Sequence, residues 1–396
     1  MAEVNEYFKD KYEEETKEFK GKIRRHRMSI VYRILLIIAI IAAVLGAFYY
    51  NYQKMVYSGY DVLRSIEYTE AATAHYLAFN GNVLRYSQDG ASAFNMDNDM
   101  IWNETYQMQN PMVDSCGDYV ALGDYKGTSI YVFNSTGLMG TIDTTIPLQR
   151  FCVSGNGNVA AVLEEDDVTW VKLYDQLGNN IANDRTTMAK SGYPVDVDLS
   201  EDGILLAVSY LYMDSGVLST SVAFYNFGAV GENEIDNLVS GYNYSNTIVS
   251  YVEFINSKTC IAVGDNRFII FSGDQKPESV FEMAVEDEIQ SVFYNAENIG
   301  LVFNNDNAEN RYRLDIYDIA GNLKQQQEFS KEYKDIKFNR DLVIIYNATE
   351  CEIYNMDGLK KFSGNFKNSA ISLIPTGSKT KFLLVSGSKM EEIQLK

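Results

Sequence analysis

Histidine limits the catalytic chemistry of this chain most, because its 396 residues include only two, His26 and His75. His26 precedes a long apolar segment and His75 follows it, so the two cannot meet if that segment spans a membrane. A zinc site or facial triad built from several histidines is therefore excluded. A Ser/His/Asp or Cys/His arrangement could use only His75. That residue stands in "AATAHYLAF" without a nearby nucleophile, and we expect it to be structural.

Carboxylates are plentiful, and a pair of them is the remaining candidate for acid–base chemistry. Glycoside hydrolysis, for example, needs two carboxyl groups roughly 5 to 10 Å apart. The acidic segments are "MDNDM" (96–100), "EEDD" (164–167) and "DVDLSEDG" (196–203). Asp and Asn favour turns because their side chains bond to the neighbouring backbone. We therefore expect most of these residues at hairpin tips, and the sequence selects no catalytic pair.

Motifs for metals and cofactors are weak. The segment "FNNDNAENR" (303–311) gathers oxygen ligands but lacks the spacing of a calcium loop. "SGNGNV" (154–159) lies between two expected strands rather than before a helix, which indicates a hairpin turn and not a nucleotide loop. The cysteines are far apart and form no CxxC, so we expect buried free thiols: Cys116, Cys152, Cys260 and Cys351. We predict no catalytic residue, no cofactor and no metal.

Composition favours a β-rich fold that does not bind nucleic acid. Tyr (29) and Phe (20) are abundant and Pro (5) is scarce, a bias that suits pleated, half-buried surfaces. The net charge is −20, although residues 1–33 hold nine Lys or Arg against seven Asp or Glu. The remainder is strongly acidic. Phosphate binding needs a basic face, so nucleic acid is excluded as a partner.

One apolar segment, "ILLIIAIIAAVLGAFYY" (34–50), is near the minimum length for crossing a bilayer, and uncharged residues extend it to Gln53. Tyr49, Tyr50 and Tyr52 suit the far interface. Six basic residues stand between Lys20 and Arg33, against a single Lys54 after the segment. The positive-inside rule then places the N-terminus in the cytoplasm and the rest outside the cell.

These features predict three regions: a charged cytoplasmic tail (1–33), a transmembrane helix (34–53) and an extracytoplasmic domain (54–396). The competing interpretation is a cleaved signal peptide. Against it, the preceding region is long and no good A-x-A site follows the apolar segment. The tail has mixed charges at helical spacing, so it is either a solvated helix that docks a cytosolic partner or a plain polar extension.

A sequence motif, exemplified by "RLDIYDIAGNL" (313–323), recurs through the rest of the chain. Each copy is a strand, a turn with a residue that tolerates positive φ, and a second strand. The turn residues follow one another at steps of 37 to 50 residues: Asn98, Gly137, Gly178, Gly228, Gly273, Gly321 and Gly358. A second hairpin precedes each copy of the motif, as in "VDLSEDGILLAVSY" (197–210). Two hairpins per repeat make the four-stranded blade of a β-propeller.

Seven copies of the motif predict seven blades near 74–110, 111–147, 148–193, 194–248, 249–286, 287–331 and 332–368. The last segment, 371–396, supplies three more strands, and "YDVLRSIEYT" (60–69) could add the fourth. Such pairing would remove an open sheet edge. We therefore predict an all-β, eight-bladed propeller behind a single N-terminal transmembrane helix. The alternative is seven blades with the extra strands capping the outside.

Several phrases carry a family resemblance, notably "LRYSQDGASAFN", "IWNETYQMQNPMV", "GYPVDVDLSEDGILLAVSYL" and the closing "EEIQLK". The chain resembles uncharacterised single-pass membrane proteins of Gram-positive bacteria, with a domain of unknown function and a quinoprotein-like or WD40-like propeller. The resemblance covers residues 30–396 and implies no established activity. It implies that Trp102 lies in an outermost strand and packs between blades. The quinone cofactor of quinoprotein enzymes is not expected, because no two cysteines adjoin.

The fourth blade has longer loops than its neighbours, and binding surfaces tend to grow on such loops. They hold four tyrosines that form a possible binding surface: Tyr210, Tyr212, Tyr242 and Tyr244. The leading hypothesis is a non-enzymatic, membrane-tethered module that binds an envelope protein, peptide or polymer. The alternative is an enzyme that acts on a glycan or peptide through carboxylates of the propeller channel. A third possibility, a structural role in envelope assembly, differs from the first only in its partner.

Overall fold

The chain consists of two compact units, residues 1–56 and residues 57–396. The structure, a computed structural model, describes residues 2–67, 74–95, 97, 99–166, 168–186, 192–305, 309–387 and 389–396.

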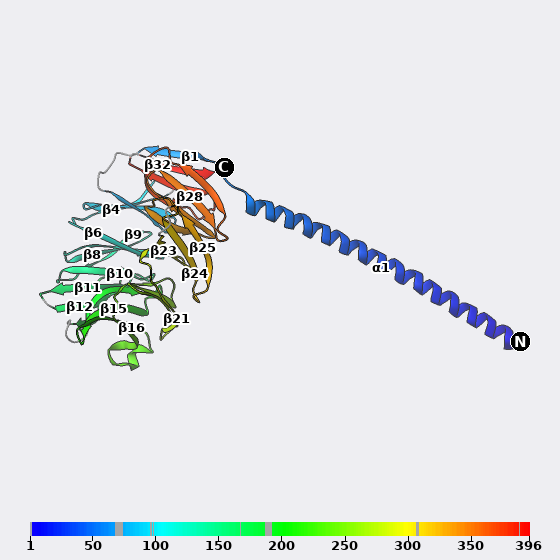
Figure 1. Cartoon of the computed structure of the whole chain (residues 1–396), viewed down its shortest axis with the longest axis horizontal. Coiled ribbons are helices and arrows are strands. Elements are labelled where there is room, and N and C mark those ends of the chain that lie inside the picture. The colour runs from blue at the N-terminus through cyan, green and yellow to red at the C-terminus, as the bar shows by residue number, and fades with distance from the viewer. Residues whose placement is uncertain are drawn as a thin grey trace. The chain divides into compact units, whose positions relative to one another are not determined.

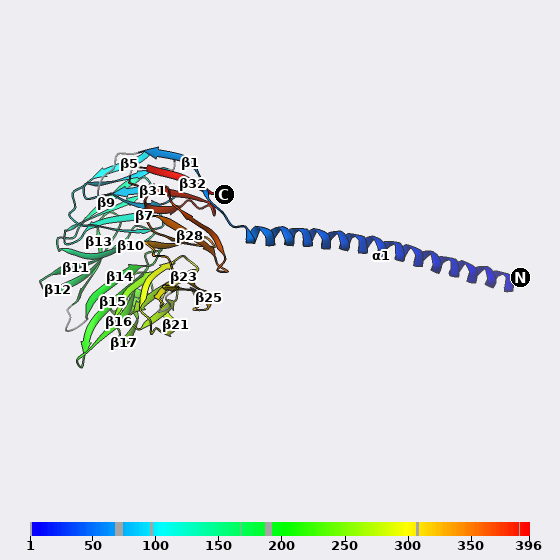
Figure 2. The same ribbon diagram turned by 45° about the horizontal axis from the view of Figure 1, so that its top comes forward.

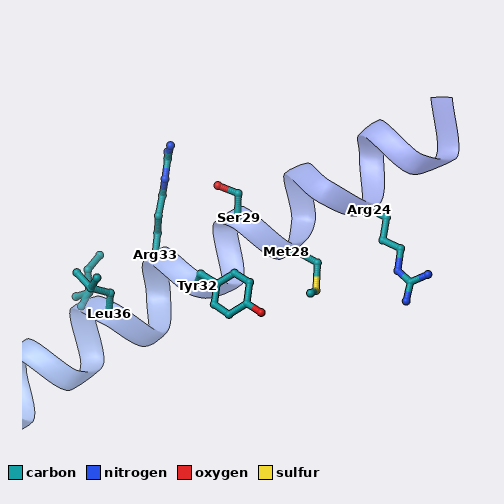
Figure 3. A pocket seen from close by; sticks show the side chains of 7 residues that line it. Arg24, Met28, Ser29, Tyr32, Arg33 and Leu36 are labelled. Atoms are coloured by element: carbon teal, nitrogen blue, oxygen red, sulfur yellow. The ribbon is translucent and has the colours of Figure 1, made fainter. Parts of the chain in front are cut away.

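The first unit is one long helix, α1 (Ala2–Lys54). Its segment His26–Phe48 is long and apolar enough to cross a membrane. The charged tail continues into this segment without a break in the helix, so the tail is helical, and its docking of a cytosolic partner stays a prediction. Figure 3 shows the boundary between the charged and apolar parts, with Arg24, Met28, Ser29, Tyr32, Arg33 and Leu36. Basic and aromatic side chains of this kind are typical of a membrane interface.

The second unit contains eight four-stranded antiparallel sheets, the blades. Blades one to four are β2 (His75–Phe79), β3 (Asn82–Tyr86), β4 (Gly90–Phe94), β5 (Met100–Thr105); β6 (Pro111–Cys116), β7 (Tyr119–Asp124), β8 (Ser129–Asn134), β9 (Gly137–Asp143); β10 (Leu148–Val153), β11 (Val159–Glu165), β12 (Val168–Tyr174), β13 (Asn180–Thr186); and β14 (Tyr193–Leu199), β15 (Leu205–Asp214), β16 (Val217–Asn226), β17 (Leu238–Ser245). In blade four, two short 3-10 helices, η1 (Gly231–Asn233) and η2 (Ile235–Asn237), lie between β16 and β17.

Blades five to eight are β18 (Val249–Phe254), β19 (Thr259–Gly264), β20 (Arg267–Ser272), β21 (Glu278–Ala284); β22 (Ile289–Tyr294), β23 (Asn298–Asn304), β24 (Tyr312–Asp318), β25 (Leu323–Phe329); β26 (Asp335–Asn339), β27 (Leu342–Tyr346), β28 (Glu350–Asn355), β29 (Lys360–Asn365); and β30 (Ala370–Pro375), β31 (Lys381–Ser386), β32 (Lys389–Leu395) with β1 (Tyr60–Glu67).

The blades form a closed ring. First strands of successive blades contact one another, as β6 does with β10, β10 with β14 and β14 with β18, so the first strand of each blade is innermost. The ring closes where β30 contacts β2. Figures 1 and 2 both show β1, in blue, beside β32, in red. Their register runs from Tyr60 opposite Leu395 to Glu67 opposite Lys389. The eight-bladed prediction is confirmed, and the seven-bladed alternative is wrong.

The hydrophobic core lies between the blades rather than in a single centre. One cluster, for example, joins Ile130 and Val132 of blade two to Phe151 and Val159 of blade three. Trp102 lies on β5, the outermost strand of blade one, and stacks on Phe133 of blade two with ring centroids 4.9 Å apart. The position implied by the family resemblance is therefore confirmed. Each blade depends on its neighbours for much of its apolar burial.

The repeated sequence motif forms the turn between the third and fourth strands of a blade. In blade six, Asp318 Oδ1 accepts hydrogen bonds from the backbone N–H groups of Ala320 (3.0 Å) and Asn322 (2.9 Å). Gly321 has φ +83°, a conformation that side chains disfavour. Although burial acts to raise it, hydrogen bonds from Asn322 and Lys324 lower the pKa of Asp318 to about 2. Asp318 and Gly321 are therefore required by this turn. Gly137, Gly178 and Gly358 share the positive φ, whereas Gly228 and Gly273 do not, and Asn98 lies outside the described residues.

Candidate functional site

A cavity of about 270 Å³ lies among the ends of the innermost strands of blades two to six. Its wall includes Asp114 on β6, Asp198 on β14, Glu253 on β18 and Tyr294 on β22. These residues are distant in sequence and meet because their blades are consecutive in the ring. The cavity is close to the smallest volume usual for a small-molecule site.

The aspartates bridge neighbouring blades. Asp114 accepts a hydrogen bond from the backbone N–H of Val153 (2.6 Å), on the innermost strand of blade three. From blade four, Asp196 and Asp198 accept hydrogen bonds from Val252 N–H (2.9 Å) and Phe254 N–H (2.6 Å) of blade five. An innermost strand is an edge strand and leaves backbone N–H groups unpaired. These carboxylates therefore satisfy edge donors that would otherwise be buried without partners.

Glu253 is held by tyrosines instead of backbone groups. Tyr251 donates to Glu253 Oε2 at 3.1 Å, and Tyr294 of the next blade donates to Glu253 Oε1. Burial, followed by the charge of Glu253, raises the pKa of both hydroxyls. The tyrosines therefore remain protonated donors and fix the position of the carboxyl group.

The electrostatics of this cluster favour bound protons. Burial is the main cause that raises the pKa of Asp114 to about 6 and that of Glu253 to about 7. Burial and the neighbouring carboxylate of Glu253 raise the pKa of Asp198 well above its usual value. Asp196 differs because it also pairs with Arg150 at 2.7 Å, although burial still raises its pKa. Around neutral pH the cluster can thus take up and release a proton, the property required of an acid or base.

Two thiols adjoin the cluster but are poor nucleophiles. Cys116 borders the cavity, and burial raises its pKa to about 12. Cys152 is buried, and burial raises its pKa well above the usual value. Because the thiolate is the reactive form, neither thiol is activated. All four cysteines are free, as the sequence predicted, although Cys116 is only partly buried.

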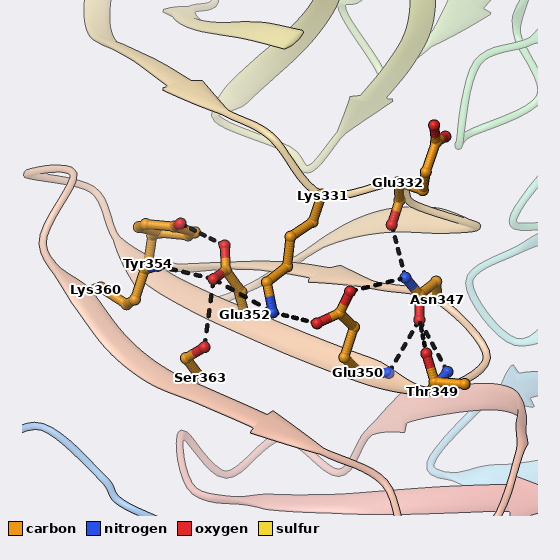
Figure 4. A network of polar contacts seen from close by, with 9 residues as sticks. All are labelled: Lys331, Glu332, Asn347, Thr349, Glu350, Glu352, Tyr354, Lys360 and Ser363. Atoms are coloured by element: carbon orange, nitrogen blue, oxygen red, sulfur yellow. Dashed lines mark hydrogen bonds and ion pairs between the residues drawn. The ribbon is translucent and has the colours of Figure 1, made fainter. Parts of the chain in front are cut away.

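A second polar network, on blade seven, shows what charge compensation does to a buried carboxylate (Figure 4). Glu352 is buried, yet it accepts hydrogen bonds from Lys360 (2.7 Å) and Tyr354 (2.6 Å), and Lys331 lies 3.7 Å away. Although burial acts to raise it, these partners lower the pKa of Glu352. Glu253 shows the opposite shift, because its hydrogen-bond partners are neutral hydroxyls.

The tyrosines predicted to form a binding surface do not lie on loops. They lie on strands β15 and β17, near the end of the blade opposite η1 and η2: Tyr210, Tyr212, Tyr242 and Tyr244. Tyr210 is buried with its hydroxyl 3.0 Å from that of Tyr225, and Tyr244 is buried too. Tyr212 and Tyr242 are partly exposed. Tyr210 and Tyr244 belong to the apolar clusters that blade four forms with its two neighbours, and a binding role for the four tyrosines stays a prediction.

The other chemical candidates are dispersed. The expectation that acidic residues occupy turns is confirmed for Asp97 and Asp202, but it is wrong for Asp196 and Asp198, which are buried within β14. His75 begins β2 and stacks on Tyr86. Among the described residues, no three His, Cys, Asp or Glu side chains are arranged to hold a metal ion. The centre of the oxygen-rich segment 303–311, residues 306–308, lies outside the described residues.

Sequence reasoning missed that Asp198 and Glu253 share one cavity. Two features of the sequence could have indicated this. The alternating aspartates of "VDVDL" share one face of a strand, and Glu253 is next to last in the first strand of blade five, as Asp198 is in the first strand of blade four. The closed ring of blades, with a cavity at the ends of its innermost strands, defines the protein as an eight-bladed β-propeller that follows an N-terminal apolar helix.

The chain belongs to a family of unknown function, DUF5711, whose model matches residues 52–395. Among solved structures, it is similar to BamB from Moraxella catarrhalis (TM-score 0.50, 11% identity, 85% of this chain and 100% of that chain). It is also similar to Hsv2 from Kluyveromyces lactis (TM-score 0.47, 11% identity, 74% and 98%). At such identities the similarity shows the fold alone. No curated protein matches the sequence.

Proposed function

We propose that this protein is a non-enzymatic binding or scaffold module, anchored in the cell membrane by α1, whose propeller binds a protein, peptide or polymer of the envelope outside the cell. In this proposal residues 1–33 lie in the cytoplasm, 34–53 cross the membrane and 54–396 are extracytoplasmic. The basic residues ahead of the apolar segment support this orientation.

The observation that carries the proposal is the closure of the ring by strand pairing between the two ends of the propeller. The first strand after the helix, β1, is the outermost strand of blade eight and pairs with the last strand of the chain. An anchor at α1 is thereby built into the propeller rather than attached through a long linker. The use of Asp114, Asp196 and Asp198 as bridges between blades supports a structural role for them.

Cysteine labelling tests the topology. Wild-type protein serves as the blank, because its thiols are buried or partly buried with raised pKa values. We expect a membrane-impermeant maleimide to label Asn243→Cys, at an exposed position of β17, on intact cells. Lys20→Cys, at an exposed position of α1, should react only after permeabilisation. The reverse pattern would overturn the orientation, and release of the protein by an alkaline wash would overturn the anchor.

Crosslinking from the same positions tests the binding role. A crosslinker on Asn243→Cys should recover a reproducible envelope component that the same crosslinker on Lys20→Cys does not recover. Equal recovery from both positions would count against a propeller-specific partner.

A second candidate function, hydrolysis of a glycan or peptide, is favoured by one observation. Asp198 and Glu253 line the same cavity, and both have raised pKa values. Activity of the purified full-length chain on envelope glycans or peptides, abolished in Asp198→Asn and Glu253→Gln, would support this function over the first.

A further inference from the structure

The propeller has two distinct faces, and the chain enters at one of them. Strands alternate in direction within a blade, so the turn after the first strand and the turn after the third strand lie at the same end. Asn156 in such a turn donates to the carbonyl of Asp202 in the next blade (2.9 Å), and Asn339 donates likewise to Ser378 (2.8 Å). These bonds place the corresponding ends of successive blades together. We call this surface the entry face.

The name follows from the position of β1. Tyr60, its first residue, pairs with Leu395 near the end of the third strand of blade eight. Ser58 N–H donates to the carbonyl of Lys396 at 2.8 Å, in the place where the other blades have their turn between third and fourth strands. The polypeptide that arrives from α1 therefore joins the propeller at the entry face.

Exposed large apolar side chains gather around this face. Each of blades two to seven has at least one in the turn between its third and fourth strands or within the first three residues of the fourth. We define the apolar rim by one residue from each of these blades: Leu138, Leu177, Ile235, Val280, Leu323 and Leu359. These turns belong to the outer hairpins, so the residues lie toward the perimeter of the ring.

In the part of the chain that the structure describes, the opposite face shows no such ring. Among the described residues, its turns expose large apolar side chains only at Tyr125 in blade two and on the long hairpin of blade four, where Met213, Val217 and Leu218 lie. Toward the channel, the entry face presents polar turns, for example at Asn156, as well as the acidic cavity. Single exposed apolar residues are normal on a protein surface, but an exposed apolar residue at the same place in six successive blades is not explained that way.

Chain connectivity indicates the occupant of this rim. Five residues separate Lys54, the end of α1, from Tyr60. At about 3.5 Å per extended residue, they limit the distance between the helix end and Tyr60, where the chain enters the propeller, to roughly 20 Å. The apolar segment ends six residues earlier, at Phe48, which adds only about 9 Å of helix. A surface so close to a bilayer has the bilayer itself as its nearest apolar partner.

We propose that the apolar rim of the entry face rests on the lipid bilayer in which α1 is anchored. This inference depends on the membrane anchor of the proposed function. The rim side chains insert at the level of the lipid headgroups, while the polar turns near the channel remain hydrated above the membrane. A ring of separate apolar contacts suits an extended flat surface better than the compact patch of a protein partner.

Lipid-mediated quenching tests the rim with matched pairs. The full-length chain carries the environment-sensitive fluorophore nitrobenzoxadiazole on Leu177→Cys or Met213→Cys, and phosphatidylcholine nanodiscs contain lipid spin-labelled near the headgroup. Leu177 is 60% exposed on the rim and Met213 is 59% exposed on the opposite face. Leu359→Cys and Val217→Cys form a second pair (46% and 40% exposed). We expect quenching several-fold stronger at 177 than at 213, and several-fold stronger at 359 than at 217.

The possible outcomes distinguish the two proposals. Equal or reversed quenching within either pair, in protein that remains in the nanodisc, overturns the rim contact and leaves the anchor intact. Protein that does not co-purify with nanodiscs overturns the anchor, and the rim contact with it. Quenching that disappears when Leu177→Cys is combined with Leu138→Asp and Leu323→Asp would further support apolar insertion, whereas unchanged quenching would contradict it.

Discussion

Replacing Glu253 by glutamine should remove much of the pH dependence of the propeller's stability near neutrality. Folding raises the pKa of Glu253 from its usual 4.5 to about 7. The folded protein therefore binds a proton more tightly than the unfolded chain does. The stability that Glu253 contributes is fully present below about pH 4.5 and is lost as the pH rises through 7. At about 1.4 kcal/mol per pKa unit, this residue costs about 3 kcal/mol at pH 8.

Glutamine is neutral at every pH and can still bond to Tyr251 or Tyr294, at a cost of about 1 kcal/mol for imperfect pairing. The loss of unfolding free energy between pH 5 and pH 8 should therefore be about 2 to 3 kcal/mol smaller in Glu253→Gln than in wild type. The remaining pH dependence comes from Asp114 and Asp198, whose pKa values are also raised.

Urea unfolding of the full-length chain in one detergent, followed by the fluorescence of Trp102 and Trp170, measures this difference at both pH values. Glu297→Gln is the matched control, since Glu297 lies exposed in a turn of blade six and its substitution should leave the profile unchanged. A Glu253→Gln profile parallel to that of wild type, or a variant less stable than wild type at pH 8, would refute the reasoning.

Two further predictions concern the turn and the closure of the ring. Gly321→Ala should lower the unfolding free energy by about 3 kcal/mol, because φ is +83° and a Cβ would lie 2.2 Å from the Phe281 ring. The control Gly216→Ala has φ +86° but open space around the Cβ, and it should lower the unfolding free energy by only about 1 kcal/mol. Equal losses for the two variants in urea titrations would contradict the packing argument. Val62→Asp should lower the unfolding free energy of the propeller by about 2 to 3 kcal/mol, because it places a charge against the core of blades seven and eight. Leu63→Asp, on the exposed side of β1, should change that free energy by no more than about 0.5 kcal/mol. Equal melting temperatures for the two variants of β1 would argue against its role in closure.

The sequence alone was sufficient to predict the architecture, because the signals of a propeller are local. Alternation within each strand and the Gly residues at positive φ, such as Gly178 and Gly358, follow from the backbone geometry of a single hairpin. Repetition of that hairpin then predicts blades. The pairing of β1 with the C-terminal strands was also predictable, since an unpaired edge needs a partner.

The candidate site was decided by the tertiary structure. Asp198 and Glu253 are 55 positions apart, and each occupies an ordinary polar position in an alternating strand. Alternation did not reveal that Tyr210 is buried, because residues 205–210 of β15 are buried on both faces of the blade, against blades three and five. Ring closure brings innermost strands together, excludes water from their carboxyl groups and thereby shifts their pKa values. Local sequence thus determines which strands and turns form, whereas burial between blades determines which acidic side chains acquire unusual chemistry.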